Sequence, residues 1–177
     1  MRSQATAKKQ KADIYTEEER VRRDSTSWTL VQGILAPIQF LVFGVSLVLI
    51  VRFMWTGEGQ EAAAMSVLVK TLVLYTIMVT GAAWEKAVFG QWLFAPAFFW
   101  EDVVSFGVIA LHTLYVWMWF GANADPMTCF FIALAAYASY LVNAAQFLIK
   151  FGLARRARAA RSDRSGQSDD SELGVAI

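Results

Sequence analysis

The sequence predicts an all-α integral membrane protein with four transmembrane helices, both termini in the cytoplasm and a short amphipathic helix near the N-terminus. Hydrophobic residues make up 56% of the 177-residue chain and charged residues only 18%, whereas soluble domains carry about 25% charged residues. Most of the charges lie near the two ends. The nearly uncharged middle contains four apolar runs, each near the roughly 20 residues that a spanning helix needs.

The polar N-terminal segment, residues 1–27, precedes the first apolar run. Thr16 and Glu19 have the T-x-x-E spacing of a capping box, which predicts a short helix near residues 17–23. A long polar stretch followed by a run that can itself span the membrane is unlike a cleaved signal peptide, so we expect none.

The four-helix membrane domain, residues 28–151, contains the predicted spans. They are residues 31–55, 62–84, 103–121 and 127–151. These runs are apolar on almost every side, whereas the helices of a soluble bundle keep a polar face. Two connections, residues 56–61 and 122–126, are short. The third, residues 85–102, is longer and aromatic, and because Pro96 interrupts it we expect it to lie on the membrane surface.

Basic residues predict the orientation of the spans. Seven precede the first span and five follow the last: Arg2, Lys8, Lys9, Lys11, Arg20, Arg22 and Arg23, then Arg155, Arg156, Arg158, Arg161 and Arg164. The two short connections contain none. Because basic residues gather on the cytoplasmic side, both ends are predicted to be cytoplasmic. The C-terminal tail, residues 152–177, is basic at first and has a composition typical of disorder from Ser162 onward.

Cys129 is the only cysteine and His112 the only histidine. A disulfide within the chain is therefore impossible, and a zinc site or iron–sulfur cluster built from this chain alone is excluded, since each needs several such ligands. No glycine-rich nucleotide-binding motif is present, which argues against dehydrogenase, kinase and ATPase chemistry. A reaction carried out by this chain should need only protons and water.

Trp-Glu pairs stand at both ends of the aromatic connection, as Trp84-Glu85 and Trp100-Glu101, and Asp102 follows the second pair. The predicted topology places these carboxylates together at the cytoplasmic ends of two spans. Carboxyl groups beside aromatic rings favour a pocket that opens towards the cytoplasm. The alternative is that they are solvated helix ends, with Glu101 and Asp102 complementing a helix dipole and Glu85 kept ionised by the lysine beside it.

Uncharged polar side chains are concentrated in the same half of the predicted spans. They are Gln32, Gln39, Thr80, Ser105, Ser139, Asn143 and Gln146. Gln32 and Gln39 share one helix face, as do Ser139, Asn143 and Gln146. Either these groups form the floor of the pocket, or they only hold membrane helices together by hydrogen bonds.

Two ionisable residues lie deep in the predicted spans. His112 is nine residues into the third span, about 13 Å deep. Three roles remain open for it: ligand to the metal of a bound pigment, proton carrier, or hydrogen-bonded packing residue. Lys70 lies about 12 Å from the outer face by the same rise per residue, and we expect its side chain to snorkel outward.

Six stretches of the chain resemble a known family. They are WTLVQG at residues 28–33, LAPIQFLV at 35–42, VKTLVLYTIMVTG at 69–81, WEK at 84–86, FAPAFFWED at 94–102 and NAAQFL at 143–148. Together, in order and without a gap, they are similar to the vinyl bacteriochlorophyllide hydratase family of photosynthetic bacteria. The resemblance covers roughly residues 15–155, and its motifs are long and specific.

The resemblance implies a lyase, a hydratase that adds water to the 3-vinyl group of chlorophyllide a or 3-vinyl bacteriochlorophyllide a to give the 3-(1-hydroxyethyl) derivative. This reaction belongs to bacteriochlorophyll synthesis and needs no cofactor, since magnesium is only part of the pigment. The resemblance also implies a multi-pass protein of the bacterial inner membrane, cytoplasmic or intracytoplasmic. The expected partners are the pigment, the lipid bilayer and other pigment-biosynthesis enzymes, with no nucleic acid.

Such a reaction assigns roles to the polar residues. Protonation of the terminal vinyl carbon gives a cation that the macrocycle delocalises, and water then adds to the inner carbon. An apolar wall favours the protonated form of a carboxyl group, so Glu101 or Asp102 is the expected acid. The second carboxylate, or Glu85, would deprotonate the water. The residues expected to bind the substrate are Trp84, Trp100, Gln39, Ser105, His112, Asn143 and Gln146.

The competing hypothesis is a non-catalytic membrane protein that holds a pigment or assists assembly of a photosynthetic complex. The aromatic pocket and His112 would serve that role equally well. The carboxylates argue for an enzyme, because a protein that only holds a pigment does not need them.

Overall fold

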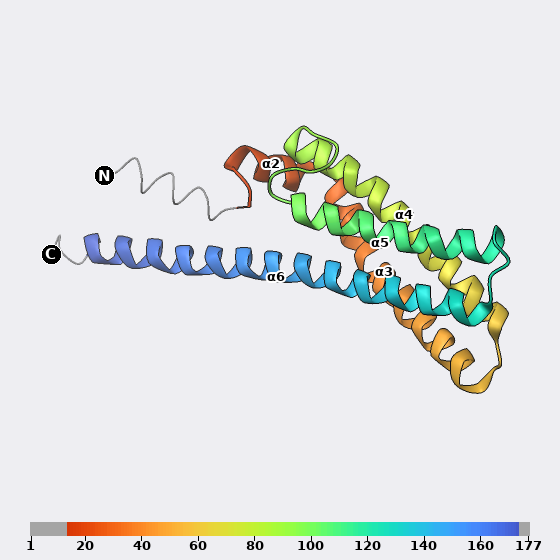
Figure 1. The fold of residues 1–177 in the computed structure, drawn as a ribbon. Helices are drawn as coiled ribbons and strands as arrows, with labels where there is room; N and C mark the ends of the chain where they lie inside the picture. The colour runs from red at the N-terminus through yellow and green to blue at the C-terminus, as the bar shows by residue number, and fades with distance from the viewer. Residues whose placement is uncertain (1–13, 174–177) are drawn as a thin grey trace. The chain divides into compact units, whose positions relative to one another are not determined.

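The computed structural model describes residues 14–173, with side chains to residue 156, and over this range its regular structure is helical. The helices are α2 (Glu17–Ser25), α3 (Ser27–Thr56), α4 (Gln60–Phe89), α5 (Phe99–Phe120) and α6 (Pro126–Leu173) (Figure 1). The chain divides into two units. One is Tyr15–Asn143, and the described part of the other is Ile14 and the remainder of α6 from Ala144.

Four of the described helices are long and apolar enough to cross a membrane. They are Ser27–Thr56, Gln60–Phe89, Phe99–Phe120 and Pro126–Arg156. Only 17–39% of the most apolar stretch of each is buried inside the protein, so most of its apolar side chains face outward, as a bilayer requires. Hydrogen bonds within each helix satisfy the backbone in a medium that offers no water. The chain is therefore a multi-pass membrane protein, and the prediction of four spans is confirmed.

The ends of α2, α3 and α4 follow from local sequence signals. Thr16 and Glu19 form both hydrogen bonds of the predicted capping box at the start of α2. Gly57 and Gly59 have φ angles of 74° and 83° in the turn between α3 and α4, and Gly90 ends α4 with φ 82°. Glycine adopts this left-handed conformation without the steric cost that a Cβ atom brings.

Within the unit Tyr15–Asn143, α3 and α4 lie side by side, and α2 lies against the end of α4 that is remote from their turn (Figure 1). Hydroxyl groups join the helices. The Ser46 hydroxyl on α3 is 2.7 Å from the Ser66 hydroxyl on α4 and 2.6 Å from the Tyr137 hydroxyl on α6. On the other side of α4, the Tyr75 and Thr113 hydroxyls are 2.6 Å apart and connect α4 to α5.

The connection between α4 and α5 is shorter than predicted. The sequence suggested a single surface segment over residues 85–102, but α4 continues to Phe89 and α5 begins at Phe99. The Lys86 ammonium group donates a hydrogen bond of 2.7 Å to the carbonyl of Gly90 and so caps the extended end of α4. As a result, Glu85, Glu101 and Asp102 lie on helices rather than in a connection.

The described part of the C-terminal tail also differs from its prediction. Residues 162–173 have a composition typical of disorder, yet they continue α6 as a helix to Leu173. The alanines and arginines that precede them are strong helix formers, which favours continuation of the helix. Residues 1–13 of the predicted polar segment and residues 174–177 of the tail lie outside the described residues, and the predicted domain boundaries stay predictions.

Candidate functional site

Two carboxyl groups meet at the junction of α4 and α5. Glu85 comes from the last turns of α4 and Asp102 from the first turn of α5, and their side chains are close enough to interact directly. We call them the carboxyl pair. Glu85 is 5% exposed and Asp102 is 4% exposed. A carboxylate can only accept hydrogen bonds, so two carboxyl groups bond to each other only when one carries a proton. Two buried carboxyl groups in this arrangement therefore favour a shared proton.

The connection between the two helices folds over the carboxyl pair. The backbone N–H of Phe94 donates to Asp102 Oδ2 over 2.7 Å, and the N–H of Ala95 donates to Glu85 Oε2 over 3.1 Å. Phe94 has φ 60°, a conformation that is uncommon for a residue with a side chain. Both carboxyl groups hold this connection in place through these hydrogen bonds. They therefore stabilise the structure whether or not they also act as an acid or a base.

The burial of these groups contradicts the alternative of solvated helix ends. Glu101 is 7% exposed and is as enclosed as the carboxyl pair. The expected pairing of Glu85 with Lys86 is also wrong, because Lys86 turns towards Gly90 and Glu85 accepts from Ala95. Sequence spacing shows which helix ends meet, but it does not show that nine connecting residues will close over them.

Ser105 and Asn143, two of the predicted substrate-binding residues, meet beside the first turn of α5. The Asn143 amide on α6 donates to the Glu101 carbonyl and to the Ser105 hydroxyl, each over 2.9 Å. Ser105 donates to the same carbonyl over 2.8 Å. These bonds hold α6 against α5, so helix association is the role that the contacts support for both residues.

The predicted aromatic wall divides into two groups. Trp84 packs inward with Tyr15, Phe89 and Phe98, at ring separations of 5.6–6.5 Å. Its indole N–H donates to the Thr29 hydroxyl over 2.9 Å. Trp84 therefore packs α4 against α3 and the start of α2.

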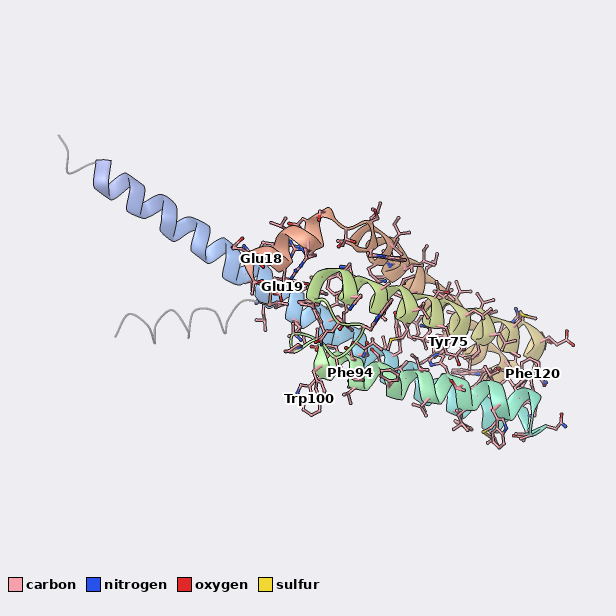
Figure 2. The ribbon with its side chains drawn as sticks, turned by 90° about the horizontal axis from the view of Figure 1, so that it is seen from above. Glu18, Glu19, Tyr75, Phe94, Trp100 and Phe120 are labelled. Atoms are coloured by element: carbon pink, nitrogen blue, oxygen red, sulfur yellow. The ribbon has the colours of Figure 1, made fainter. Side chains whose placement is uncertain are left out.

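Trp100 belongs to the second group, which lies on the surface and which we call the aromatic ladder: Phe94, Phe99, Trp100 and Phe106. Phe94 stacks on Phe106 at 5.5 Å and contacts Phe99 at 5.7 Å, and Phe99 contacts Trp100 at 5.5 Å. Figure 2 shows Phe94 and Trp100 close together at the end of α5 remote from Phe120. Phe94 thus links the ladder, through its backbone N–H, to the carboxyl pair.

His112 and Lys70 lie deeper in the bundle, where they contact Tyr137 and Tyr140, which are one turn apart on α6, and Gln39 is buried on α3. His112 Nδ1 is 2.8 Å from the Val108 carbonyl, and its ring stacks on Tyr137 at 5.8 Å. Because a carbonyl only accepts, Nδ1 carries the proton and Nε2 presents a lone pair in the neutral ring. Among the described residues, His112 Nε2, Lys70 Nζ and Gln39 Oε1 have no hydrogen-bond partner, although each is buried.

The predicted outward snorkelling of Lys70 is wrong. Its side chain is fully buried, and its Nζ lies 3.7 Å from the centre of the Tyr140 ring on α6. Lys70 occurs in register with the buried residues Ala63, Val67 and Leu74, a spacing of 3–4 residues that marks one helix face. This spacing can be read from the sequence. It did not predict the burial of Lys70 because the surrounding helix is largely apolar, so its buried face does not differ clearly from its other faces.

The remaining polar residues make different kinds of contact, and one of them supports helix association. The Gln32 amide donates to the Thr80 hydroxyl over 2.8 Å and joins α3 to α4. Ser139 bonds back to the Ala135 carbonyl of its own helix over 3.0 Å. Gln146 lies in the unit that begins at Ala144, so it is described apart from the other predicted site residues. Within residues 14–156, no group of three or more His, Cys, Asp or Glu side chains could hold a metal ion.

Comparison with known proteins assigns this arrangement to a family. The family model described as 2-vinyl bacteriochlorophyllide hydratase matches residues 15–153. A relative of that name from Rhodobacter capsulatus is 72% identical over 142 residues, which cover 80% of this chain and 82% of the relative. A second relative of that name, from Cereibacter sphaeroides, is 65% identical over 142 residues, which cover 80% of this chain and 88% of the relative. No solved structure matches the chain.

Proposed function

This chain belongs to the 2-vinyl bacteriochlorophyllide hydratase family, and we propose that it adds water to the vinyl group of a chlorophyllide or bacteriochlorophyllide with the carboxyl pair as proton donor. The vinyl group is numbered 2 in the family name and 3 in current macrocycle numbering. The product is the 1-hydroxyethyl derivative. The observation that carries the proposal is the pairing of two buried carboxyl groups, Glu85 and Asp102, which favours a shared proton at the helix junction.

The proposed reaction begins with transfer of that proton to the terminal vinyl carbon. The carbon–carbon double bond supplies the electron pair for the new C–H bond, and the inner carbon becomes a cation that the macrocycle delocalises. Water adds to this carbon, and its excess proton returns to the carboxyl pair. Oxidation states balance, and the acid is regenerated without a cofactor. Asp102 is the better donor of the two because its helix also carries three members of the aromatic ladder, Phe99, Trp100 and Phe106.

The aromatic ladder is the surface that we propose for the flat macrocycle. Phe94, Phe99, Trp100 and Phe106 are all exposed, by 39–69%, and stacked rings of this kind bind flat conjugated ligands by their faces. Phe94 connects this surface to Asp102 through a hydrogen bond of 2.7 Å. A macrocycle lying on the ladder would therefore bring its edge to the carboxyl pair. Glu101, in the same turn, is the next candidate for the acid.

A pigment-holding role is the second candidate function, and one observation favours it. The free lone pair on His112 Nε2 has the chemistry of a ligand to the magnesium of a pigment. His112 lies ten residues along α5 from Asp102, however, which is about 15 Å of helix. The vinyl group of a pigment held at His112 would then lie away from the carboxyl pair, because the magnesium occupies the centre of the macrocycle. One pigment would not use both sites.

We further propose that both termini face the cytoplasm of a bacterium, with α2 lying on the surface of its inner membrane. The basic residues near both ends support this orientation. The α4–α5 junction would then open to the cytoplasmic interface, where a pigment with a polar edge can enter. Lipid and neighbouring pigment-biosynthesis enzymes are the partners that this placement suggests.

The test is incubation of membranes containing the full chain with chlorophyllide a, followed by mass analysis of the extracted pigment. A gain of one water that depends on the protein supports the hydratase. Pigment that copurifies with the protein but never gains water would support the holding role instead.

A further inference from the structure

Tyr15 is enclosed by aromatic rings at the α4–α5 junction. It is 7% exposed. Its ring stacks on that of Phe89 at 5.7 Å with an interplanar angle of 10°. It also meets the rings of Trp84 and Phe98, at 6.5 and 6.4 Å. Trp84 and Phe89 lie on α4, whereas Tyr15 lies directly before Thr16, the capping residue of α2. A side chain from the N-terminal segment therefore completes an aromatic cluster that the membrane helices begin.

The contacts of α2 fix the position of Tyr15. The Arg23 guanidinium group lies over the Tyr15 ring, 4.8 Å from its centre, within the range of a cation–π contact. The Arg23 carbonyl accepts a hydrogen bond of 2.6 Å from the Thr29 hydroxyl, which itself accepts from the Trp84 indole N–H over 2.9 Å. Because Trp84 also contacts Tyr15, these interactions form a closed loop through α2, α3 and α4.

Phe98 connects this aromatic cluster to the carboxyl pair. It is 1% exposed. Its backbone N–H donates to the Ala95 carbonyl over 2.7 Å, and its carbonyl accepts from the Asp102 N–H over 3.0 Å. The Ala95 N–H in turn donates to Glu85. A displacement of the Phe98 ring would therefore move backbone that is bonded to both members of the pair.

We propose that Tyr15 is a positioning residue for the hydration reaction. This inference rests on the proposed function, because it takes the carboxyl pair to be the acid. Tyr15 holds the Phe98 ring in place and thereby keeps the N–H groups of Phe94 and Ala95 directed at the pair. It acts through the α4–α5 connection and not on the reacting atoms. Displacing a catalytic group by about 1 Å can lower a rate about 10²-fold, so this indirect support is measurable.

The first test is hydrogen exchange of the solubilised full chain, read by mass spectrometry for the peptide that covers residues 91–98. Tyr15→Ala removes three ring contacts, and each aromatic pair contributes a factor of about 2 to 10. Exchange of this peptide should therefore be roughly 10- to 100-fold faster. Tyr15→Phe keeps the ring and should exchange at the parent rate. Trp55→Ala is the matched control, because Trp55 is 86% exposed and lies at the end of α3 remote from α2.

The second test measures hydration of chlorophyllide a by the same variants in membranes. Tyr15→Ala should lower kcat about 10- to 100-fold. KM should change by less than about 3-fold, because three rings of the aromatic ladder lie on α5 and not in the connection. Tyr15→Phe should have the kcat of the parent. A residue that only packs α2 against the bundle would lower thermal stability without this loss of kcat in the folded protein.

Each outcome decides the proposal. A parent-like exchange rate for residues 91–98 in folded Tyr15→Ala protein would overturn it, and so would a parent-like kcat. Tyr15→Leu replaces the alanine variant if that variant does not insert, since leucine keeps an apolar side chain but cannot stack. A parent chain that never hydrates chlorophyllide contradicts the proposed function. Faster exchange in the variant would then still assign to Tyr15 the support of the connection.

Discussion

Replacing Asp102 by asparagine tests the carboxyl pair with little change in structure. The amide oxygen of asparagine can still accept from the Phe94 N–H, which donates over 2.7 Å in the parent, and its N–H can donate to Glu85. The exchange of one strong hydrogen bond for a neutral one should lower stability by about 1 kcal/mol. The side chain at position 102, in contrast, can no longer carry or donate a carboxylic proton.

The expected kinetic effect is much larger than this structural one. General acid catalysis contributes about 10²–10⁴-fold, which corresponds to about 3–5 kcal/mol of activation free energy. Hydration by Asp102→Asn membranes should fall by that factor, measured as hydroxyethyl product formed per unit time by mass analysis. Binding of chlorophyllide, measured by absorbance, should change little because the macrocycle does not depend on the proton.

Asp102→Ala is the control that separates folding from chemistry. Alanine leaves the Phe94 N–H and the Glu85 carboxyl group without their partner, which costs about 1–3 kcal/mol for a buried group. This variant should lose thermal stability as well as activity. If Asp102→Asn turns over within a few-fold of the parent while it inserts and binds pigment, the proton comes from elsewhere. Glu101 would then be the first group to examine.

Four further outcomes follow from the same contacts. Glu85→Gln should reduce hydration nearly as much as the change at Asp102, since the lysine once expected to keep it ionised bonds elsewhere; a normal rate would show that one carboxyl group suffices. His112→Ala should leave the affinity ratio of magnesium-containing to metal-free pigment unchanged, and a selective loss of the magnesium form would favour the holding role. Trp100→Ala should weaken pigment binding without lowering the melting temperature, because its ring is 69% exposed. Reporter fusions after Arg158 should read cytoplasmic and those within residues 57–59 periplasmic, and the reverse would refute the proposed orientation.

The sequence predicted the spans because length and apolar composition are sufficient for a helix in lipid. It also predicted the capping box of α2, in which Thr16 and Glu19 interact locally. It placed Glu85 and Asp102 on the same side of the membrane because consecutive spans run antiparallel and their connected ends lie on one side. These features depend on contacts close in sequence or on topology, and both are readable from one chain.

The features that the sequence did not predict depend on packing between distant residues. The burial of Glu85 and Asp102 results from a connection that turns at Phe94, and nothing in the residue types of that connection demands a φ of 60° there. Lys70 is buried because Tyr140, seventy residues later, covers its amine. Trp84 and Trp100 follow the same Trp-Glu pattern, yet one packs inward and the other is exposed. In each case the burial of the side chain is determined by residues that contact it in space.

The two peptide groups that anchor the α4–α5 connection have a consequence for the moment after the proton leaves. In the proposed reaction the carboxyl pair would then carry an additional negative charge in a place with little solvent to stabilise it. The N–H dipoles of Phe94 and Ala95 already point at Asp102 and Glu85, and their bonds strengthen as the acceptors become anionic. These fixed dipoles would act as a preorganised solvent for the charge that develops during the reaction. The same turn of backbone that closes the site would thereby lower the barrier to giving up the proton.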